Sequence, residues 1–297
     1  MELPPLTRLV FGLAVPESIT PRDAGLGSLL RWLGVKAGVE MVRFQVPSYD
    51  ALARQMRDGT IQVAWLPPIV FVRLERDGIA VPLVTNRRKY EGPLGAGYQS
   101  VLLVRQNSRI HTLDGLRGAN AAWVDPLSAA GYVLPRVHLA ALGIDPRGLF
   151  AQERFLGSHE AAVRAVIDGD ADVAATFAGL DASGAVVRGG WSDVEGCEQG
   201  LRVLATFGAI PADLIAVRTD APVGLRETLA DALVSACADA TMSIIAKRVF
   251  GIESFGLEGF ASYDGLRRAI DAAALSGLLE GTDSQGRLPT RPPGPPA

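Results

Sequence analysis

The chain has few cysteines and few lysines, and it has no long apolar run. Its two cysteines, Cys197 and Cys237, lie far apart in no spacing typical of a metal or redox site, so we read both as small hydrophobic residues. No apolar stretch approaches the ~20 residues that cross a bilayer, so we expect no membrane span. The net charge is −3 and no basic run is interleaved with aromatic residues, which excludes a nucleic-acid partner. We expect neither a metal nor another cofactor.

The first 16 residues lack the features of a secretion signal. They carry one basic residue, a glutamate, prolines and an apolar run at 9–15 that is short for such a signal, with no small-residue cleavage pattern. We interpret this segment as the first strand of the fold. A chain that begins here natively is expected to stay in the cytoplasm, whereas an exported protein is expected to have lost a leader; both alternatives stay open.

Short apolar strands alternate with helical stretches along the chain. At 297 residues, 48% of them hydrophobic, the chain is long enough for two lobes, each with its own core. The expected strands are 9–15, 42–46, 61–65, 81–85, 98–105, 121–124, 152–156, 171–176, 202–207 and 214–218. The expected helices are 27–37, 49–57, 69–76, 113–116, 129–142, 159–167, 223–250 and 262–275. Such alternation predicts βαβ units, and therefore an α/β fold whose lobes are mostly parallel sheets flanked by helices.

Changes of composition suggest where the chain passes between the lobes. A polar, glycine-rich loop at 87–97 precedes the first crossing, and the segment 210–218 reads as the return. The predicted lobes are 1–99 with 217–281, and 100–216, joined by two crossing strands. The last residues, 282–297, have five prolines after residue 288 and are expected to form a disordered tail.

An internal repeat relates the two lobes. Residues 48–65 align without a gap to residues 158–175, which lie 110 positions later, and seven of the eighteen positions are identical. Each copy has a serine that caps a helix, an acidic residue in the first turn, a helix end at Asp-Gly and a following strand. The two lobes are therefore expected to be built alike.

The stretch 121–143 contains the most distinctive candidate site. An apolar strand is followed by Asp-Pro-Leu-Ser, so that Ser128 lies where a helix begins. The first helical turn has N–H groups without internal acceptors and the positive end of the dipole, so an anion beside Ala129, Ala130 and Gly131 would meet donors. Gly131 is expected to let a ligand approach the backbone closely. The alternative is that Ser128 is only the N-cap of an ordinary strand-to-helix turn.

The repeat extends this hypothesis to both lobes. Parallel sheets bind ligands beyond the carboxyl ends of their strands, where helix N-termini also point. If the two lobes face each other across a cleft, Tyr49 and His159, which hold equivalent positions in the repeat, flank the ligand from opposite sides. The alternatives are that His159 belongs only to a capping turn and that Tyr49 is a surface aromatic residue.

Several short segments carry a family resemblance. They are SYDAL with DGTIQVAWL (48–66), GYQSVLLV (97–104), DGLRG (114–118), VDPLSAAGYVLP (124–135), GSHEAAV (157–163) and IPAD (210–213). In this order and spacing they resemble the type II periplasmic solute-binding proteins of phosphate and phosphonate ABC transporters, over residues 9–263. The resemblance implies the two-lobed type II fold and non-catalytic binding of a small oxyanion by hinge closure. It also implies an ABC permease as partner, a monomer and a periplasmic location.

The resemblance assigns ligand contacts by matching the family's motifs. They are Ser128 and the amides of Ala129, Ala130 and Gly131 around the anion, the hydroxyls of Tyr49 and Tyr98, the imidazole of His159, and Asp213 toward an amine of the ligand. Trp65 is read either as a wall of the cleft or as a core residue.

Ala129 and Ala130 depart from the family pattern, which has two further hydroxyl residues there. Hydrogen bonds to charged groups contribute ~1.5–3 kcal/mol each, so this loss predicts weaker phosphonate binding unless other donors compensate. Arg87, Arg88 and Lys89 are candidates for that compensation, and solvated loop charges are the alternative reading.

Two other functions stay open. Ser128, His159 and Asp213 supply the residue types of a hydrolase triad on the same scaffold, although no Gly-x-Ser-x-Gly elbow is present. A cytoplasmic ligand sensor is the second alternative, and the absence of a recognisable leader favours it.

Overall fold

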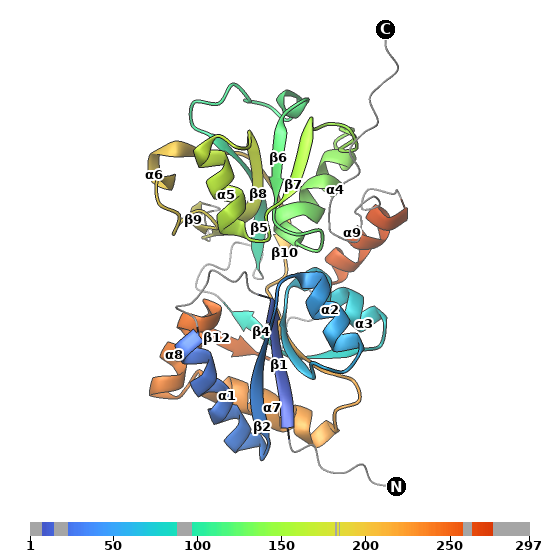
Figure 1. Cartoon of the computed structure of the whole chain (residues 1–297), viewed down its shortest axis with the longest axis vertical. Coiled ribbons are helices and arrows are strands. Elements are labelled where there is room, and N and C mark those ends of the chain that lie inside the picture. The colour runs from blue at the N-terminus through green and yellow to red at the C-terminus, as the bar shows by residue number, and fades with distance from the viewer. Residues whose placement is uncertain are drawn as a thin grey trace. The chain divides into compact units, whose positions relative to one another are not determined.

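The computed structural model describes residues 8–14, 23–87, 97–181, 183, 185–257 and 263–275. The predicted proline-rich tail lies outside these residues. The chain divides into two compact units, labelled by element in Figure 1. Unit 1 is drawn from Met1–Gln99, Ala178–Arg188 and Ala209–Arg268, and unit 2 from Ser100–Phe177, Gly189–Gly208 and Ala269–Ala297. A six-stranded sheet forms the frame of each unit.

The sheet of unit 1 has the strand order β12-β4-β11-β3-β1-β2. The strands are β1 (Arg8–Ala14), β2 (Glu40–Val46), β3 (Val63–Leu66), β4 (Ala80–Arg87), β11 (Leu214–Arg218) and β12 (Ser254–Gly256). β1 pairs in parallel with β2 and β3, as the βαβ pattern predicts. β11 is antiparallel to both β3 and β4, and β12 is antiparallel to β4, so this sheet is mixed. All of β11 lies in this sheet, whereas the boundary placed after residue 216 divides that strand.

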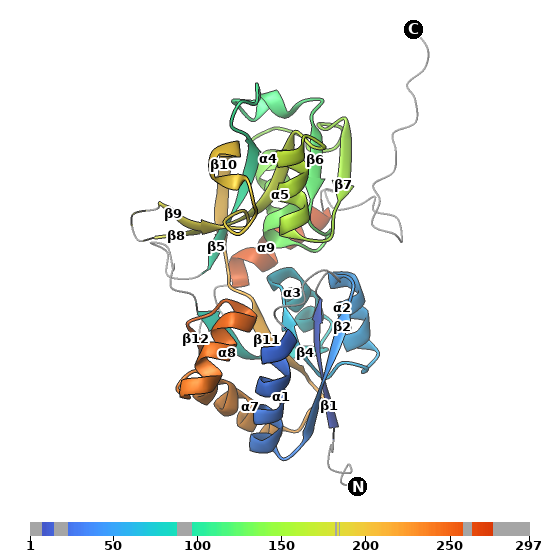
Figure 2. The same ribbon diagram turned by 60° about the vertical axis from the view of Figure 1, so that its left-hand side comes forward.

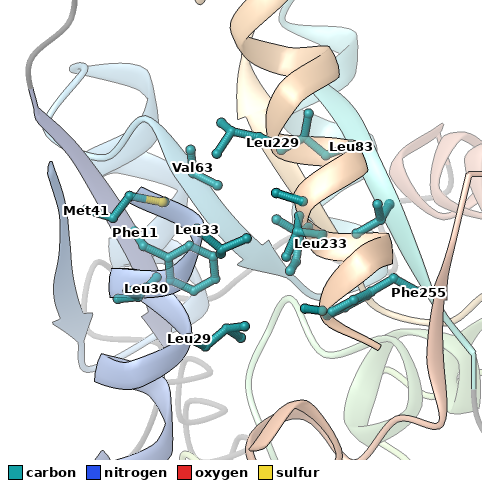
Figure 3. Packing of buried hydrophobic residues seen from close by; sticks show 14 of the residues in the cluster. Phe11, Leu29, Leu30, Leu33, Met41, Val63, Leu83, Leu229, Leu233 and Phe255 are labelled. Atoms are coloured by element: carbon teal, nitrogen blue, oxygen red, sulfur yellow. The ribbon is translucent and has the colours of Figure 1, made fainter. Parts of the chain in front are cut away.

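Helices cover both faces of this sheet. They are α1 (Asp23–Ala37), α2 (Tyr49–Arg57), α3 (Pro68–Arg76), α7 (Val223–Ala236) and α8 (Ala240–Phe250), and α9 (Asp264–Leu275) begins in the same unit. Figures 1 and 2 show α1, α7 and α8 together on one face, with α2 and α3 on the other. Apolar side chains from α1, α7 and the strands, among them Phe11, Leu33, Leu233 and Phe255, fill the core under the first group (Figure 3).

The helical pattern expected over 223–250 is two helices, not one. α7 ends at Ala236, and Asp239 caps α8 by accepting hydrogen bonds from the N–H groups of Thr241 and Met242 at 2.9 and 2.8 Å. The two axes are bent by 97°. Taken together, this bent pair has the length and composition of a membrane span, but no single helix in the described part of the chain does.

The second sheet, most of which lies in unit 2, has the order β10-β5-β8-β6-β7, with β9 paired to β8; residues 98–99, 178–180, 186–188 and 209–210 of its strands belong to unit 1. Its strands are β5 (Tyr98–Arg105), β6 (Asn120–Trp123), β7 (Gln152–Phe155), β8 (Val173–Leu180), β9 (Val186–Gly189) and β10 (Leu201–Ile210). Its helical segments are a 3₁₀ turn (Asp114–Leu116), η2 (Ala129–Val133), α4 (Leu134–Ala141), α5 (His159–Asp168) and α6 (Cys197–Gly200). The helix expected over 129–142 therefore starts as one π-helical turn, η2, before it continues as α4. β9 and α6 occupy the glycine-rich stretch 180–200, for which no regular element was expected.

The predicted repeat extends beyond its eighteen aligned positions. In unit 1, Phe11 pairs with Arg43 and with Val63. In unit 2, the residues 110 positions later pair in the same way: Ala121 with Glu153 and with Val173. The main-chain N–H of Val10 donates to Gln62 Oε1 at 2.9 Å, and that of Asn120 donates to Asp172 Oδ2 at 2.8 Å, again at the same offset. The two units thus share one β-α-β-α-β plan down to the strand register.

A buried ion pair ties α4 to the sheet of unit 2. Arg136 on α4 and Glu153 on β7 are 3% and 12% exposed, and their closest N–O distance is 2.6 Å. Glu153 also accepts a hydrogen bond from Trp123 Nε1 at 2.7 Å. Burial raises the pKa of the Glu153 carboxyl, while Arg136 and the indole oppose that shift. The guanidinium lies 5.1 Å from the ring centre of Tyr132 in η2, so this cluster also holds the turn that follows Ser128.

We expect Arg136→Met to lower the free energy of unfolding by ~3–5 kcal/mol, because it leaves a buried carboxylate without its cation. The double variant Arg136→Met/Glu153→Gln should recover most of this loss, since the neutral amide still accepts from Trp123. Urea unfolding monitored by circular dichroism measures both. A double variant no more stable than the single one would contradict this view of the pair.

Candidate functional site

The turn after β6 is fixed by its own side chains. Asp125 Oδ1 accepts a hydrogen bond from the N–H of Leu127 at 2.7 Å, and the carbonyl of Asp125 accepts one from the N–H of Ser128 at 2.9 Å. Ser128 Oγ then accepts from the N–H of Gly131 at 3.0 Å. Ser128 is therefore the N-cap of η2, and it is 3% exposed.

The π-helical turn leaves donors at its start. Its first main-chain bond joins the N–H of Val133 to the carbonyl of Ser128 at 3.0 Å, five residues apart. The N–H groups of Ala129 and Ala130 precede this bond and have no intrahelical acceptor. The hydroxyl hydrogen of Ser128 has no acceptor among the residues that the structure describes. These three donors lie at the positive end of the η2–α4 helical segment, an arrangement suited to an anion.

Ser100 on β5 holds the same turn from the sheet. Its hydroxyl donates to the carbonyl of Ala130 at 2.7 Å, and its side chain is fully buried. Both polar groups of the peptide unit between Ala130 and Gly131 are therefore hydrogen-bonded, because its carbonyl accepts from Ser100 and its N–H donates to Ser128 Oγ. Ser100 was not among the predicted site residues, because a serine directly before the apolar stretch VLLV matches no motif.

Gly131 is required by packing within the protein. A Cβ built on it lies within 2.8 Å of Ser128 Oγ and collides with the side chain of Val124. We expected this glycine to admit a ligand to the backbone, but the space beside its Cα is filled by Val124. The structural reason for Gly131 is therefore the close approach of η2 to the end of β6.

Thr176 and Phe177 contact the side chain of His159, the first residue of α5. Its Nδ1 lies 2.9 Å from Thr176 Oγ1, and Phe177 packs edge-on against the imidazole with the ring centres 5.0 Å apart. Thr176 is fully buried, and its hydroxyl lies so close to Gly190 that a Cβ there would collide with it. The packing therefore restricts the orientation of the threonine side chain. When this hydroxyl donates to Nδ1, the proton of the neutral imidazole is on Nε2, where it can be donated to an anion. Neither Thr176 nor Phe177 was predicted.

The other predicted ligand residues lie in unit 1. Tyr49 is the first residue of α2, whose N-cap, Ser48, accepts a hydrogen bond from the N–H of Ala51 at 3.1 Å. Asp213 directly precedes β11, and its carbonyl accepts from the N–H of Asn86 at 3.0 Å. Both Tyr49 and Asp213 are half-buried.

Two contacts fix the segment around Tyr98 and Asp213. Gly97 has φ +107°, and a Cβ there would collide with the carbonyl of Ile210, so glycine is required for this approach. The hydroxyl of Tyr263 donates to the carbonyl of Ala212. Burial raises the pKa of Tyr263 well above its usual value, and the nearby charge of Asp213 adds to the shift.

The predicted site residues therefore divide between the units. Unit 1 contains Tyr49, Tyr98 and Asp213, and unit 2 contains Ser128, Ala129, Ala130, Gly131 and His159. Their convergence on one ligand stays a prediction. Of the predicted compensating cations, Arg87 lies at the end of β4 against Gly256, while Arg88 and Lys89 lie outside the described residues.

The hydrolase alternative requires a hydrogen bond between Ser128 and His159. Within the described ranges, Ser128 Oγ bonds the N–H of Gly131 and makes no bond to His159. The nucleophile and base of the supposed triad are therefore not paired, and the structure gives the triad no support.

One family model matches residues 17–264, and its description is the periplasmic phosphonate substrate-binding protein of ABC transporters. The chain belongs to this family. The phosphonate-binding family consists of substrate-binding proteins, not of enzymes, and membership implies a small solute and a transporter permease as partners. No curated protein has a sequence that matches the chain significantly.

Solved structures of similar proteins confirm the predicted type II α/β fold. The XAC2383 protein from Xanthomonas citri, bound to chloride, has a TM-score of 0.74 at 20% identity, over 91% of this chain and 99% of its own. A binding protein component of a phosphonate ABC transporter from Pseudomonas aeruginosa has a TM-score of 0.73 at 18% identity, over 95% and 92%. PhnD1 from Prochlorococcus marinus, in complex with methylphosphonate, has a TM-score of 0.70 at 16% identity, over 90% and 98%.

We expect Thr176→Val to change the tautomer of the His159 imidazole. The variant keeps the shape of the side chain at position 176 but removes the hydroxyl that bonds Nδ1. Nitrogen-15 NMR of the free protein should show a loss of the Nε2–H tautomer in favour of a mixture. Thr176→Ser, which keeps the hydroxyl, should retain the original spectrum. An unchanged spectrum in the valine variant would show that Thr176 does not set the tautomer.

Proposed function

We propose that this protein binds a small oxyanion of the phosphonate or phosphate class, as the monomeric solute-binding component of an ABC transporter. The observation that carries the proposal is the start of η2, where the N–H groups of Ala129 and Ala130 and the hydroxyl of Ser128 lie together without an acceptor among the described residues. Membership of the phosphonate-binding family supports the same class of ligand. The methylphosphonate bound to the similar PhnD1 protein gives a concrete first candidate.

Each predicted residue has a role in this proposal. In unit 2, the helix start and the Nε2–H of His159 donate hydrogen bonds to the anion. In unit 1, the hydroxyls of Tyr49 and Tyr98 are the proposed further donors, and Asp213 meets an amine when the ligand has one. Binding is non-catalytic, and contacts made only when both units hold the ligand favour a closed state.

Isothermal titration calorimetry against methylphosphonate, phosphate, phosphite and methanesulfonate tests the proposal. We expect saturable binding of at least one of these, and a tenfold or larger loss of affinity in Ser128→Ala, since a hydrogen bond to a charged group is removed. Both Ser128→Ala and the control Asp239→Ala lose a helix cap, at ~1 kcal/mol of stability each. Only the first should weaken binding. If none of the four anions binds, the proposed ligand class is wrong.

The two alanines of the turn offer a test in the opposite direction. Restoring the family's hydroxyls with Ala129→Ser/Ala130→Ser should raise the affinity for methylphosphonate tenfold or more, because each new charged hydrogen bond adds ~1.5–3 kcal/mol before costs. Calorimetry measures the gain, and the unfolding temperature checks that the added atoms fit. A folded double variant with unchanged affinity would place the anion elsewhere.

A further inference from the structure

Two polar side chains at one end of the sheet of unit 1 lack hydrogen-bond partners among the residues that the structure describes. Asn86, the second-last residue of β4, is 3% exposed, and neither Nδ2 nor Oδ1 of its amide has a partner. Trp65, the second-last residue of β3, has a buried and equally unpartnered Nε1. No described residue makes a further bond to either side chain.

The strand register places both side chains on the same face. Trp65 pairs with Ile215 on β11, and Ile215 pairs with Val84 on β4, two residues before Asn86. Because side chains alternate along a strand, Asn86 and Val84 share a face. The pairing of Asn86 with Phe255 agrees, since Val84, Ile215 and Phe255 all belong to the core cluster against which Trp65 packs.

They also lie at the same end of the sheet. β3 and β4 are both antiparallel to β11, so they run in the same direction and their carboxyl ends lie at the same end of the sheet. α/β sheets bind ligands beyond the carboxyl ends of their strands. Asp213, the predicted contact for a ligand amine, is the direct main-chain partner of Asn86 there.

Aromatic rings pack on the face of the sheet that carries these two side chains. Trp65 contacts Phe250 with ring centres 5.8 Å apart, and Phe250 contacts Phe255 at 5.9 Å. A buried polar group without a partner destabilises the folded state, and a leucine at position 86 would avoid that loss. Retaining an asparagine in such a place is typical of a residue kept for binding rather than for stability.

We propose that Asn86 and Trp65 form a subsite for an oxygen atom on the carbon chain of the ligand, such as a hydroxyl or carbonyl oxygen. The indole N–H and the amide NH₂ both donate, so they suit an oxygen acceptor, and Oδ1 of Asn86 accepts the hydrogen of a hydroxyl. A purely cationic group would use only one of these atoms. This inference rests on the proposed function and deepens it: Asn86 and Trp65 set which phosphonate is preferred.

The test compares ligands that differ by one hydroxyl. We expect the protein to bind hydroxymethylphosphonate more tightly than methylphosphonate, or 2-hydroxyethylphosphonate more tightly than ethylphosphonate, by tenfold or more in calorimetry. Asn86→Leu and Trp65→Phe should reduce the preference to less than threefold, because each removes a donor to the hydroxyl oxygen. Trp32→Phe is the matched control, because Trp32 packs against the same core cluster from α1 and should keep the preference.

The thermal stability of the free variants separates a ligand contact from an internal water site. We expect Asn86→Leu to raise the unfolding temperature, since it removes a buried amide without partners. A lowered unfolding temperature with no hydroxyl preference would mean that an ordered water satisfies Asn86, and it would overturn the subsite.

The outcomes also distinguish the two proposals. If methylphosphonate binds but neither hydroxylated ligand is preferred, or if the preference survives in Asn86→Leu, the subsite is wrong and the proposed function stands. If no phosphonate binds, the proposed function fails and the subsite fails with it.

Discussion

Parallel strand pairing is the constraint on which both units depend. Two parallel neighbouring strands must be joined by a crossover, so a helix follows each strand and begins near its carboxyl end. In unit 1 this places Tyr49 at the carboxyl ends of β1, β2 and β3. In unit 2 it places Ser128 and His159 at the carboxyl ends of β6 and β7. The residues proposed to bind the ligand therefore lie at the carboxyl ends of the strands as a consequence of the strand pairing.

The sequence was most informative where a pattern repeats. Three features repeat along the chain: strands alternate with helices, Ser48 and Ser158 cap equivalent helices, and both lie in segments that are 110 residues apart. Several residues together support each of these features, so the predicted elements did not depend on single positions. The break between α7 and α8 was missed because both halves continue one apolar pattern, although Asp239 was a visible cap. The mixed pairing of unit 1 was missed because the direction of β11 depends on where the chain returns, and local composition does not encode that.

The site was less predictable than the fold, for a physical reason. Ser100, Thr176 and Asn86 are polar residues of strands, and none of them belongs to a recognisable motif. The partners of Ser100 and Thr176 are far away in sequence: Ser100 bonds the carbonyl of Ala130, and Thr176 bonds His159. A motif can place a serine at a helix start, but it does not show which residues orient that helix. Gly131 illustrates the same limit, since its neighbour Val124 is known only from the packing.

The equal strand register of the two units bears on how the molecule evolved. An identical spacing between three strands, kept 110 positions apart, is the pattern left when one ancestral segment is copied within a gene. Tyr49 and His159 occupy matching places in the two copies, each directly after a capping serine, but one is a phenol and the other an imidazole. The shared backbone plan therefore sets where these two side chains begin, while their chemistry has diverged between the copies.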